Sequence, residues 1–131
     1  MSYEDANAAI EARLNTQWAA ATSIKYENVE FEPIPGTPYI ELEIVWTDSR
    51  QASIETTPLH RATGIISINI YTALNIGTKT ADDYGDTIAG IFRGVQFSGI
   101  TCRSPVPAKI GEMDGWYVLN ISTEFYYDKT Y

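Results

Sequence analysis

Apolar residues near the N-terminus recur every three or four positions, with polar residues between them. This period is typical of a helix that packs by one face. Ser2 can cap such a helix, with Asp5 three residues later, so we expect a helix over residues 2–20. The residues on its apolar stripe are Ala6, Ile10, Leu14, Trp18 and Ala21.

Three segments alternate between apolar and polar residues with a period of two, which predicts half-buried strands. They are YIELEIVW (39–46), GIISINIY (64–71) and WYVLNISTEFYYD (116–128). The third follows Asp114-Gly115, a dipeptide typical of two-residue hairpin turns. The opposite face of these strands carries further large apolar residues, which we expect on the solvent side: Tyr39, Val45, Tyr71, Trp116 and Val118.

A second helix is predicted over residues 80–93. Thr80 and Asp83 have the spacing of a capping box, Arg93 falls in the last turn, and Gly94 stands just beyond it. The predicted buried stripe consists of Ala81, Tyr84, Ile88, Ile91 and Phe92.

The connecting segments are less regular. Pro35-Gly36 suits the centre of a type II turn, and VQFSGITCRS (95–104) reads as one short strand. Residues 47–63 have few apolar positions, so they form either an extended hairpin or a mobile segment. We expect residues 48–62 to be flexible in the isolated subunit and to become ordered on assembly.

These elements predict an α+β fold, a mostly antiparallel sheet of four to six strands with two main helices packed on one face. The length of 131 residues predicts a single domain over 1–131. The expected core comprises Ile10, Leu14, Trp18, Ile44, Ile68, Ile88, Phe92, Leu119 and Ile121.

Charge and composition exclude several classes of function. Seventeen acidic and nine basic residues give a net charge of -8, which argues against gripping the phosphates of nucleic acid. An acidic surface serves solubility, or a passage through which DNA must move without sticking. No window approaches the roughly 20 apolar residues of a membrane span, and the N-terminus is charged, so we expect a soluble, unsecreted protein.

No pattern of residues points to catalysis. Cys102 is the only cysteine and His60 the only histidine, and we interpret them as a core residue and a surface or structural residue. Asp82, Asp83 and Asp86 complement the dipole of the second helix better than they form a metal site. The single glycine of the preceding loop and Lys79 are a poor match to a phosphate-binding loop. We therefore predict no catalytic, cofactor-binding or metal-binding residue.

Four segments together resemble the small tail terminator-like proteins of tailed bacteriophages and prophages. They are IEARLNTQWA, YENVEFEPIPGTPYIELEI, HRATGIISINIYTALNIGTKTADDYGDTIAGIF and DGWYVLNISTEFYYD. The resemblance implies a structural virion protein without catalysis or cofactor, made in the host cytoplasm. It implies a ring of six copies at the head-proximal end of the tail, which caps the tube, stops its polymerisation and meets the head. The implied partners are the chain itself, the tail tube protein and a head-completion protein.

Two other interpretations stay open. A head-tail joining (neck) protein would share the acidic, ring-forming character. A small-molecule-binding or enzymatic α+β cone would enclose an apolar pocket. For assembly, the candidate interface residues are Arg50, Arg61, Tyr39, Tyr71 and Trp116.

Overall fold

The computed structural model describes residues 3–19, 21–51 and 59–130. The helices are α1 (Tyr3–Trp18) and α2 (Lys79–Phe92). The strands are β1 (Ser23–Lys25), β2 (Tyr39–Gln51), β3 (Leu59–Thr72), β4 (Gln96–Phe97), β5 (Ile100–Cys102), β6 (Val106–Met113) and β7 (Trp116–Thr130). No helix in these ranges is both long and apolar enough to cross a membrane.

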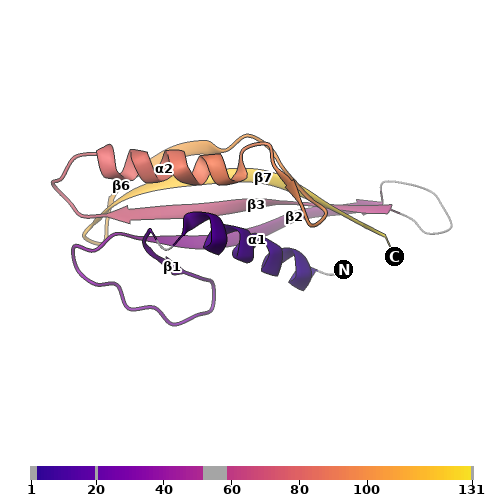
Figure 1. Cartoon of the computed structure of the whole chain (residues 1–131), viewed down its shortest axis with the longest axis horizontal. Coiled ribbons are helices and arrows are strands. Elements are labelled where there is room, and N and C mark those ends of the chain that lie inside the picture. Colours follow the sequence, from indigo (N-terminus) through magenta and orange to yellow (C-terminus); the bar gives the residue numbers. More distant parts are fainter. Residues whose placement is uncertain (1–2, 20, 52–58, 131) are drawn as a thin grey trace.

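The strands form one sheet in the order β1-β2-β3-β7-β5-β4, with β6 also paired to β7 (Figure 1). Every pair is antiparallel except β1 with β2. The predicted α+β class and mostly antiparallel sheet are therefore confirmed. The described sheet has seven strands, more than the four to six expected. One reason is that residues 95–104 fold as the β4-β5 hairpin, because Ser98 and Gly99 both take positive φ values, 47° and 81°.

One face of the sheet is apolar, because the strand register aligns the alternating aliphatic residues. Ile40 lies opposite Ile70, which lies opposite Leu119 on the other side. The buried residues of this face and of both helices belong to one core cluster. Of the predicted core residues all are buried except Ile44, which is partly buried against the same cluster.

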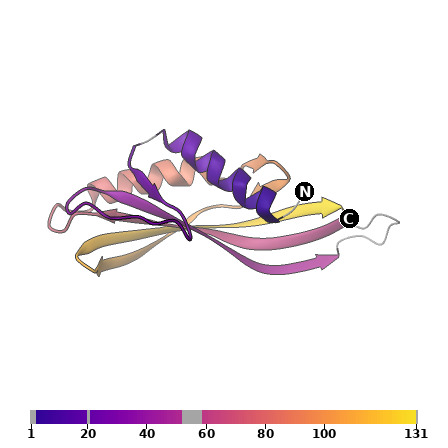
Figure 2. The same cartoon turned by 90° about the horizontal axis from the view of Figure 1, so that it is seen from below.

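Both helices contact this apolar face (Figure 2). In α1, Asn7 accepts a hydrogen bond from the indole of Trp46 at 3.1 Å, and Tyr3 meets the same ring edge-on. In α2, Gly85 lies so close to the sheet that a Cβ added to it would be 3.0 Å from the side chain of Leu119. The opposite face, called the outer face below, carries Tyr39, Tyr71 and the other residues that alternate with the core residues along β2, β3 and β7.

Two turns form as the sequence predicts. Thr37 donates its N–H to the carbonyl of Ile34 at 3.0 Å, and Gly36 between them has a φ of 78°, as a type II turn requires. Asp114 and Gly115 have φ values of 52° and 84°, the pair of positive angles of a type I′ hairpin. This turn sets the register of β6 against β7.

The predicted capping box of the second helix is wrong. Its N-cap is Thr78, which makes no side-chain cap bond, and Thr80 already lies inside the helix. Asp83 instead forms an exposed ion pair with Lys79, four residues earlier, with 2.8 Å between Lys79 Nζ and Asp83 Oδ2. The cap predicted at Ser2 lies outside the described residues.

Residues 47–63, whose apolar pattern is weak, are strand where the structure describes them. β2 continues to Gln51 through a bulge between Trp46 and Asp48, and β3 begins at Leu59. These parts match the extended hairpin. Residues 52–58 lie outside the described residues, so flexibility before assembly stays a prediction.

Candidate assembly surfaces

The aromatic residues expected on the solvent side form a small second core at one end of the outer face. Tyr39 and Tyr71 stack at 4.4 Å between ring centroids, and Trp116 meets Tyr39 edge-on at 5.2 Å. Phe31 covers Tyr39 from the connector, with 4.9 Å between the ring centroids. Val118 completes the cluster.

The prediction that Tyr39, Tyr71 and Val118 are exposed is therefore wrong. Their exposed fractions are 7%, 7% and 0%, because neighbouring strands place them in register and their side chains cover one another. Trp116 is half-buried, whereas Val45 is exposed as expected. Most of this cluster stabilises the subunit instead of offering free apolar surface.

A polar network centred on Glu41 lies next to the aromatic cluster. The carboxylate of Glu41 accepts bonds from Lys25 at 3.0 Å, from the hydroxyl of Tyr71 at 3.0 Å and from Asn69 at 3.3 Å. Burial would raise the pKa of Glu41, but these hydrogen bonds together outweigh it, and the pKa is lowered. Burial is the largest cause that raises the pKa of the Tyr71 hydroxyl, and the hydrogen bond to the Glu41 carboxylate raises this pKa further. Asn120 continues the network to Asn69 at 2.8 Å.

Replacing Glu41 with glutamine is expected to lower the free energy of unfolding at pH 7 by about 1 kcal/mol, since a partly exposed charged network is screened by solvent. Because the folded-state pKa is lowered, the carboxylate stabilises the fold above its ordinary pKa of 4.5. That contribution is lost as the pH falls through the folded-state pKa. The measurement is denaturant unfolding of the wild type and the Glu41→Gln variant between pH 3 and pH 7, about the range in which carboxyl groups titrate. The difference between their free energies of unfolding should shrink as the pH falls.

The matched control is Glu43→Gln, an exposed glutamate on the same strand and face. We expect it to change stability by less than about 0.5 kcal/mol. If Glu41→Gln lowers the free energy of unfolding by the same amount at every pH, the charged carboxylate of Glu41 does not stabilise the fold through this network.

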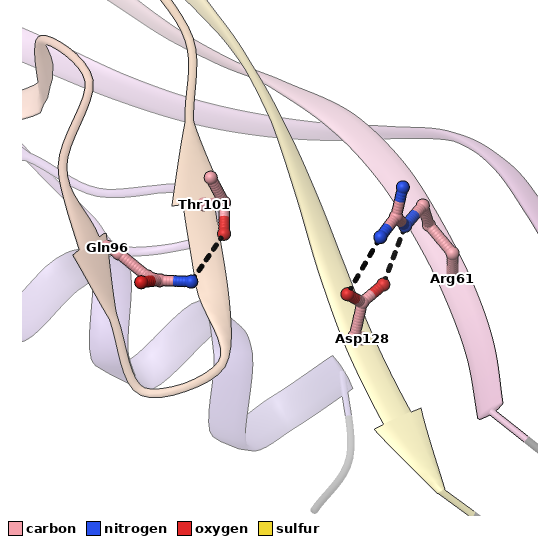
Figure 3. A network of polar contacts seen from close by, with 4 residues as sticks. All are labelled: Arg61, Gln96, Thr101 and Asp128. Carbon is pink, nitrogen blue, oxygen red and sulfur yellow. Dashed lines mark hydrogen bonds and ion pairs between the residues drawn. The ribbon is translucent and has the colours of Figure 1, made fainter.

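The other end of the outer face carries a basic and aromatic group around Tyr126. Arg61 donates two hydrogen bonds to Asp128, at 2.7 and 3.0 Å (Figure 3). Its guanidinium lies 4.1 Å from the ring centroid of Tyr126, and that of Arg103 lies 5.7 Å from the same ring. Gln96 donates to Thr101 at 3.3 Å in the neighbouring hairpin.

The predicted interface residues therefore divide between two places. Tyr39, Tyr71 and Trp116 come together at one end, while Arg61 lies at the other and is engaged within its own chain. Arg50 is placed opposite Arg61 in the β2-β3 register. Sequence reasoning missed Arg103, because only the pairing of Thr101 with Tyr126 brings it to this group.

A hollow of about 650 Å³ lies where α1, β1 and the following connector meet. None of its lining residues is buried, so it is a surface concavity and differs from the enclosed apolar pocket of the cone interpretation. Within the described ranges, no three His, Cys, Asp or Glu side chains are grouped as a metal ion would need. The lining residues are Asn15, Ala21, Thr22, Ser23, Ile24, Tyr26, Thr37, Pro38 and Tyr84.

Cys102 lies in the core, as predicted, with 3% of its surface exposed. Burial raises the pKa of its thiol to about 11, against an ordinary value of 9.0, although Arg13 lowers it slightly. We expect a thiol reagent such as Ellman's to react with the folded protein at pH 8 at least about 100-fold more slowly than with the urea-unfolded chain, since only the thiolate reacts. Equal rates in the two states would contradict this burial.

Exposed large apolar side chains concentrate on β6. Seven of its eight residues are exposed, and Val106, Ile110 and Met113 have exposed fractions of 59%, 46% and 36%. Sequence reasoning gave this segment no strand range of its own. The signal was present in the Asp114-Gly115 turn, which requires a strand on each side. Among the side chains that the structure describes, the other exposed large apolar residues are Tyr3, Val29, Ile34, Val45 and Ile76.

Comparison with known proteins identifies a family for this chain and solved structures of similar fold. A family model described as phage tail terminator protein matches residues 5–125. No curated protein matches the chain. Eighteen chains of solved structures resemble it. One of them aligns with 100% of this chain and 98% of its own length, at a TM-score of 0.68 and 21% identity, a likeness of fold alone. On the family match, which spans nearly the whole sequence, this chain belongs to the phage tail terminator family.

Proposed function

We propose that this protein is a tail terminator that closes the head-proximal end of the tail tube as a ring of six copies. The ring stops polymerisation of the tube and provides the surface to which the head joins. The observation that carries the proposal is the family match over residues 5–125. The proposed partners are further copies, the tail tube protein and a head-completion protein, and the role needs neither catalysis nor a cofactor.

The fold offers one of the surfaces that a ring subunit would use. A closed ring of identical copies uses two different surfaces of each subunit, one for each neighbour. The exposed apolar residues of β6 supply one surface that a lone subunit has little reason to expose. The aromatic cluster includes Trp116 and Val118 of β7, which pair with Met113 and Gly111 of β6.

The charge also suits a channel for DNA. The chain carries a net charge of -8, and Glu41, Glu43 and Glu124 lie on the outer face of the sheet. A wall of this sign repels phosphates, so that DNA moves past without being held. We propose that acidic residues of the ring line the passage.

The test is a phage from which the gene is deleted, examined by electron microscopy. We expect tubes that grow beyond their normal length and fail to join heads, and purified protein added during assembly should restore both length and joining. Tails of normal length that join heads without the protein would overturn the proposal. Tails of normal length that fail to join heads would instead assign the joining role of a neck protein.

A matched observation uses purified tubes. The protein should bind only at tube ends and appear there as a ring in images averaged along the tube axis. A protein that stays monomeric and never binds tube ends at high concentration would also overturn the proposal.

A further inference from the structure

We propose that neighbouring copies in the ring join at opposite edges of the sheet, with the connector of one copy resting against β6 of the next. The connector comprises residues 26–38, between β1 and β2. This inference rests on the proposed ring and names the second surface that such a ring needs. The occupant of the β6 surface is therefore another copy of this chain.

Exposed apolar side chains concentrate on these two segments. Of the eight large apolar side chains that are exposed among the described residues, five lie there. The connector extends past β1 on one side of the sheet, while β6 borders the other side (Figure 1). A closed ring needs two different surfaces of this kind on each copy, one for each neighbour. The five side chains are Val29 and Ile34 of the connector and Val106, Ile110 and Met113 of β6.

β6 lies at the height of the first half of β2, measured along the strands. Through β7 and β3, the register places Val106 level with Glu43 and Gly111 level with Tyr39. A rotation about an axis along the strands carries one copy to the next and leaves these heights unchanged. Whatever meets β6 must therefore stand beside residues 39–43 of β2 in the next copy.

The connector occupies this position beside β2. The carboxylate of Glu27 accepts the N–H of Ile44 at 2.6 Å, which fixes the start of the connector to the edge of the strand. Val29 lines a hollow together with residues 41–43 of β2, and 57% of its surface is exposed. Val29 therefore lies at the height of Val106 and is free to contact a neighbour there.

The second apolar side chain of the connector, Ile34, stands on a restricted turn. Its carbonyl accepts the N–H of Thr37 at 3.0 Å, and its side chain borders a hollow with Tyr39. Ile110, in the bulge of β6, is level with residues 39–40 of β2, so Ile34 and Ile110 share a height. Three prolines restrict the connector, so it loses little conformational freedom when a neighbour holds it.

Both segments favour a contact through side chains over strand pairing. Pro107 lacks a backbone N–H, and a bulge separates Lys109 from Gly111 in the ladder with β7. Prolines and bulges limit strand addition at a free edge. A few apolar side chains bury far less than the roughly 1,200 Å² of a small stable interface. The contact therefore forms where a tube end holds copies side by side, and dilute subunits stay apart.

Cysteine cross-linking on tube ends tests the contact. Two double variants match in height, Val29→Cys with Val106→Cys and Ile34→Cys with Ile110→Cys, and each is assembled on tubes and oxidised. Within one copy, four strand-to-strand steps of about 4.8 Å separate β1 from β6, too far for a disulfide inside one chain. All four positions are exposed, so the variants should melt like the wild type, and native Cys102 is buried and serves as the silent background.

The matched control is Val29→Cys with Met113→Cys, which places two exposed cysteines on the same segments at different heights. Val106 and Met113 lie at the two ends of β6, about 23 Å apart at the usual rise of a strand, beyond the reach of one disulfide. We expect each height-matched variant to give a ladder of covalent oligomers that ends at the closed ring. Its dimer should form at least about tenfold faster than the dimer of the control, the difference between a held contact and chance collision.

A second measurement identifies the occupant of β6. The single variant Val106→Cys is labelled with a photoactivatable maleimide, assembled on tubes and irradiated. The expected product is a dimer of this protein in which the label is attached within residues 26–38 of the other copy. A product with the tube protein or with a head protein would overturn the inference.

Two further results would overturn it. One is a ring on tube ends, visible for both height-matched variants, with no more cross-linking than in the control. The other is efficient disulfide formation by Val106→Cys alone, which would show β6 against β6. These results leave the proposed function standing, whereas wild-type protein that never binds tube ends overturns the proposed function and this inference together.

Discussion

Phe92→Ala is expected to lower the free energy of unfolding by about 3 to 5 kcal/mol, a large part of the stability of a protein of this size. Phe92 is fully buried and ends α2 within the main core. Removing the ring leaves a cavity that α2 cannot close without losing its other contacts with the sheet. Urea unfolding followed by circular dichroism gives the change as a shift in midpoint at constant slope.

Ile76→Ala is the matched control for this loss. Ile76 is 54% exposed in the loop before α2, so truncation should change stability by less than about 0.5 kcal/mol. If Phe92→Ala unfolds at the same urea concentration as Ile76→Ala, the assignment of Phe92 to the core is wrong.

Two glycine-to-alanine substitutions are expected to change stability in opposite directions. At Gly64 an added Cβ would lie 2.7 Å from the carbonyl oxygen of Val45 and 2.8 Å from the ring of Phe125. Backbone on one side and a buried ring on the other leave little room to adjust, so Gly64→Ala should cost about 1 to 3 kcal/mol. At Gly90, exposed within α2, nothing lies within 4 Å of the added atom.

Gly90→Ala should therefore raise the free energy of unfolding by about 0.5 to 1 kcal/mol, because alanine restricts the unfolded chain and favours the helix. Thermal unfolding of the two variants beside the wild type measures both changes in one experiment. If both variants change the free energy of unfolding by the same amount in the same direction, Gly64 does not lie as close to Val45 and Phe125 as described.

The sequence predicted the elements whose residues carry their own period. The stripes of Leu14 in α1 and Ile88 in α2, and the alternation around Ile68 in β3, identify both helices and the long strands. β1 has three residues and β4 has two, too short to show any period. Their pairing is decided by the strands beside them, which a local pattern does not contain.

The candidate surfaces were harder to predict for the same reason. Alternation placed Tyr39 and Tyr71 on the outer face correctly, but their burial depends on the register that stacks them and on Phe31 from the connector. Arg61 and Asp128 pair across 67 positions of sequence, so the ion pair of Arg61 within its own chain could not be foreseen. Whether a residue on the sheet is exposed therefore depends on such long-range contacts.

The place of β7 in the sheet has a consequence for how the chain folds. β7 comes last in sequence among the described strands, yet it lies between β3 on one side and β5 and β6 on the other. Its contacts with β3 join residues 45 positions apart, Thr72 with Tyr117, to 71 apart, Leu59 with Thr130. Such non-local pairing slows folding, and until residues 116–130 leave the ribosome the inner edge of β3 has no partner. We therefore expect the protein to complete its sheet only once residues 116–130 have emerged, while many identical nascent chains in the cell expose the same edge of β3.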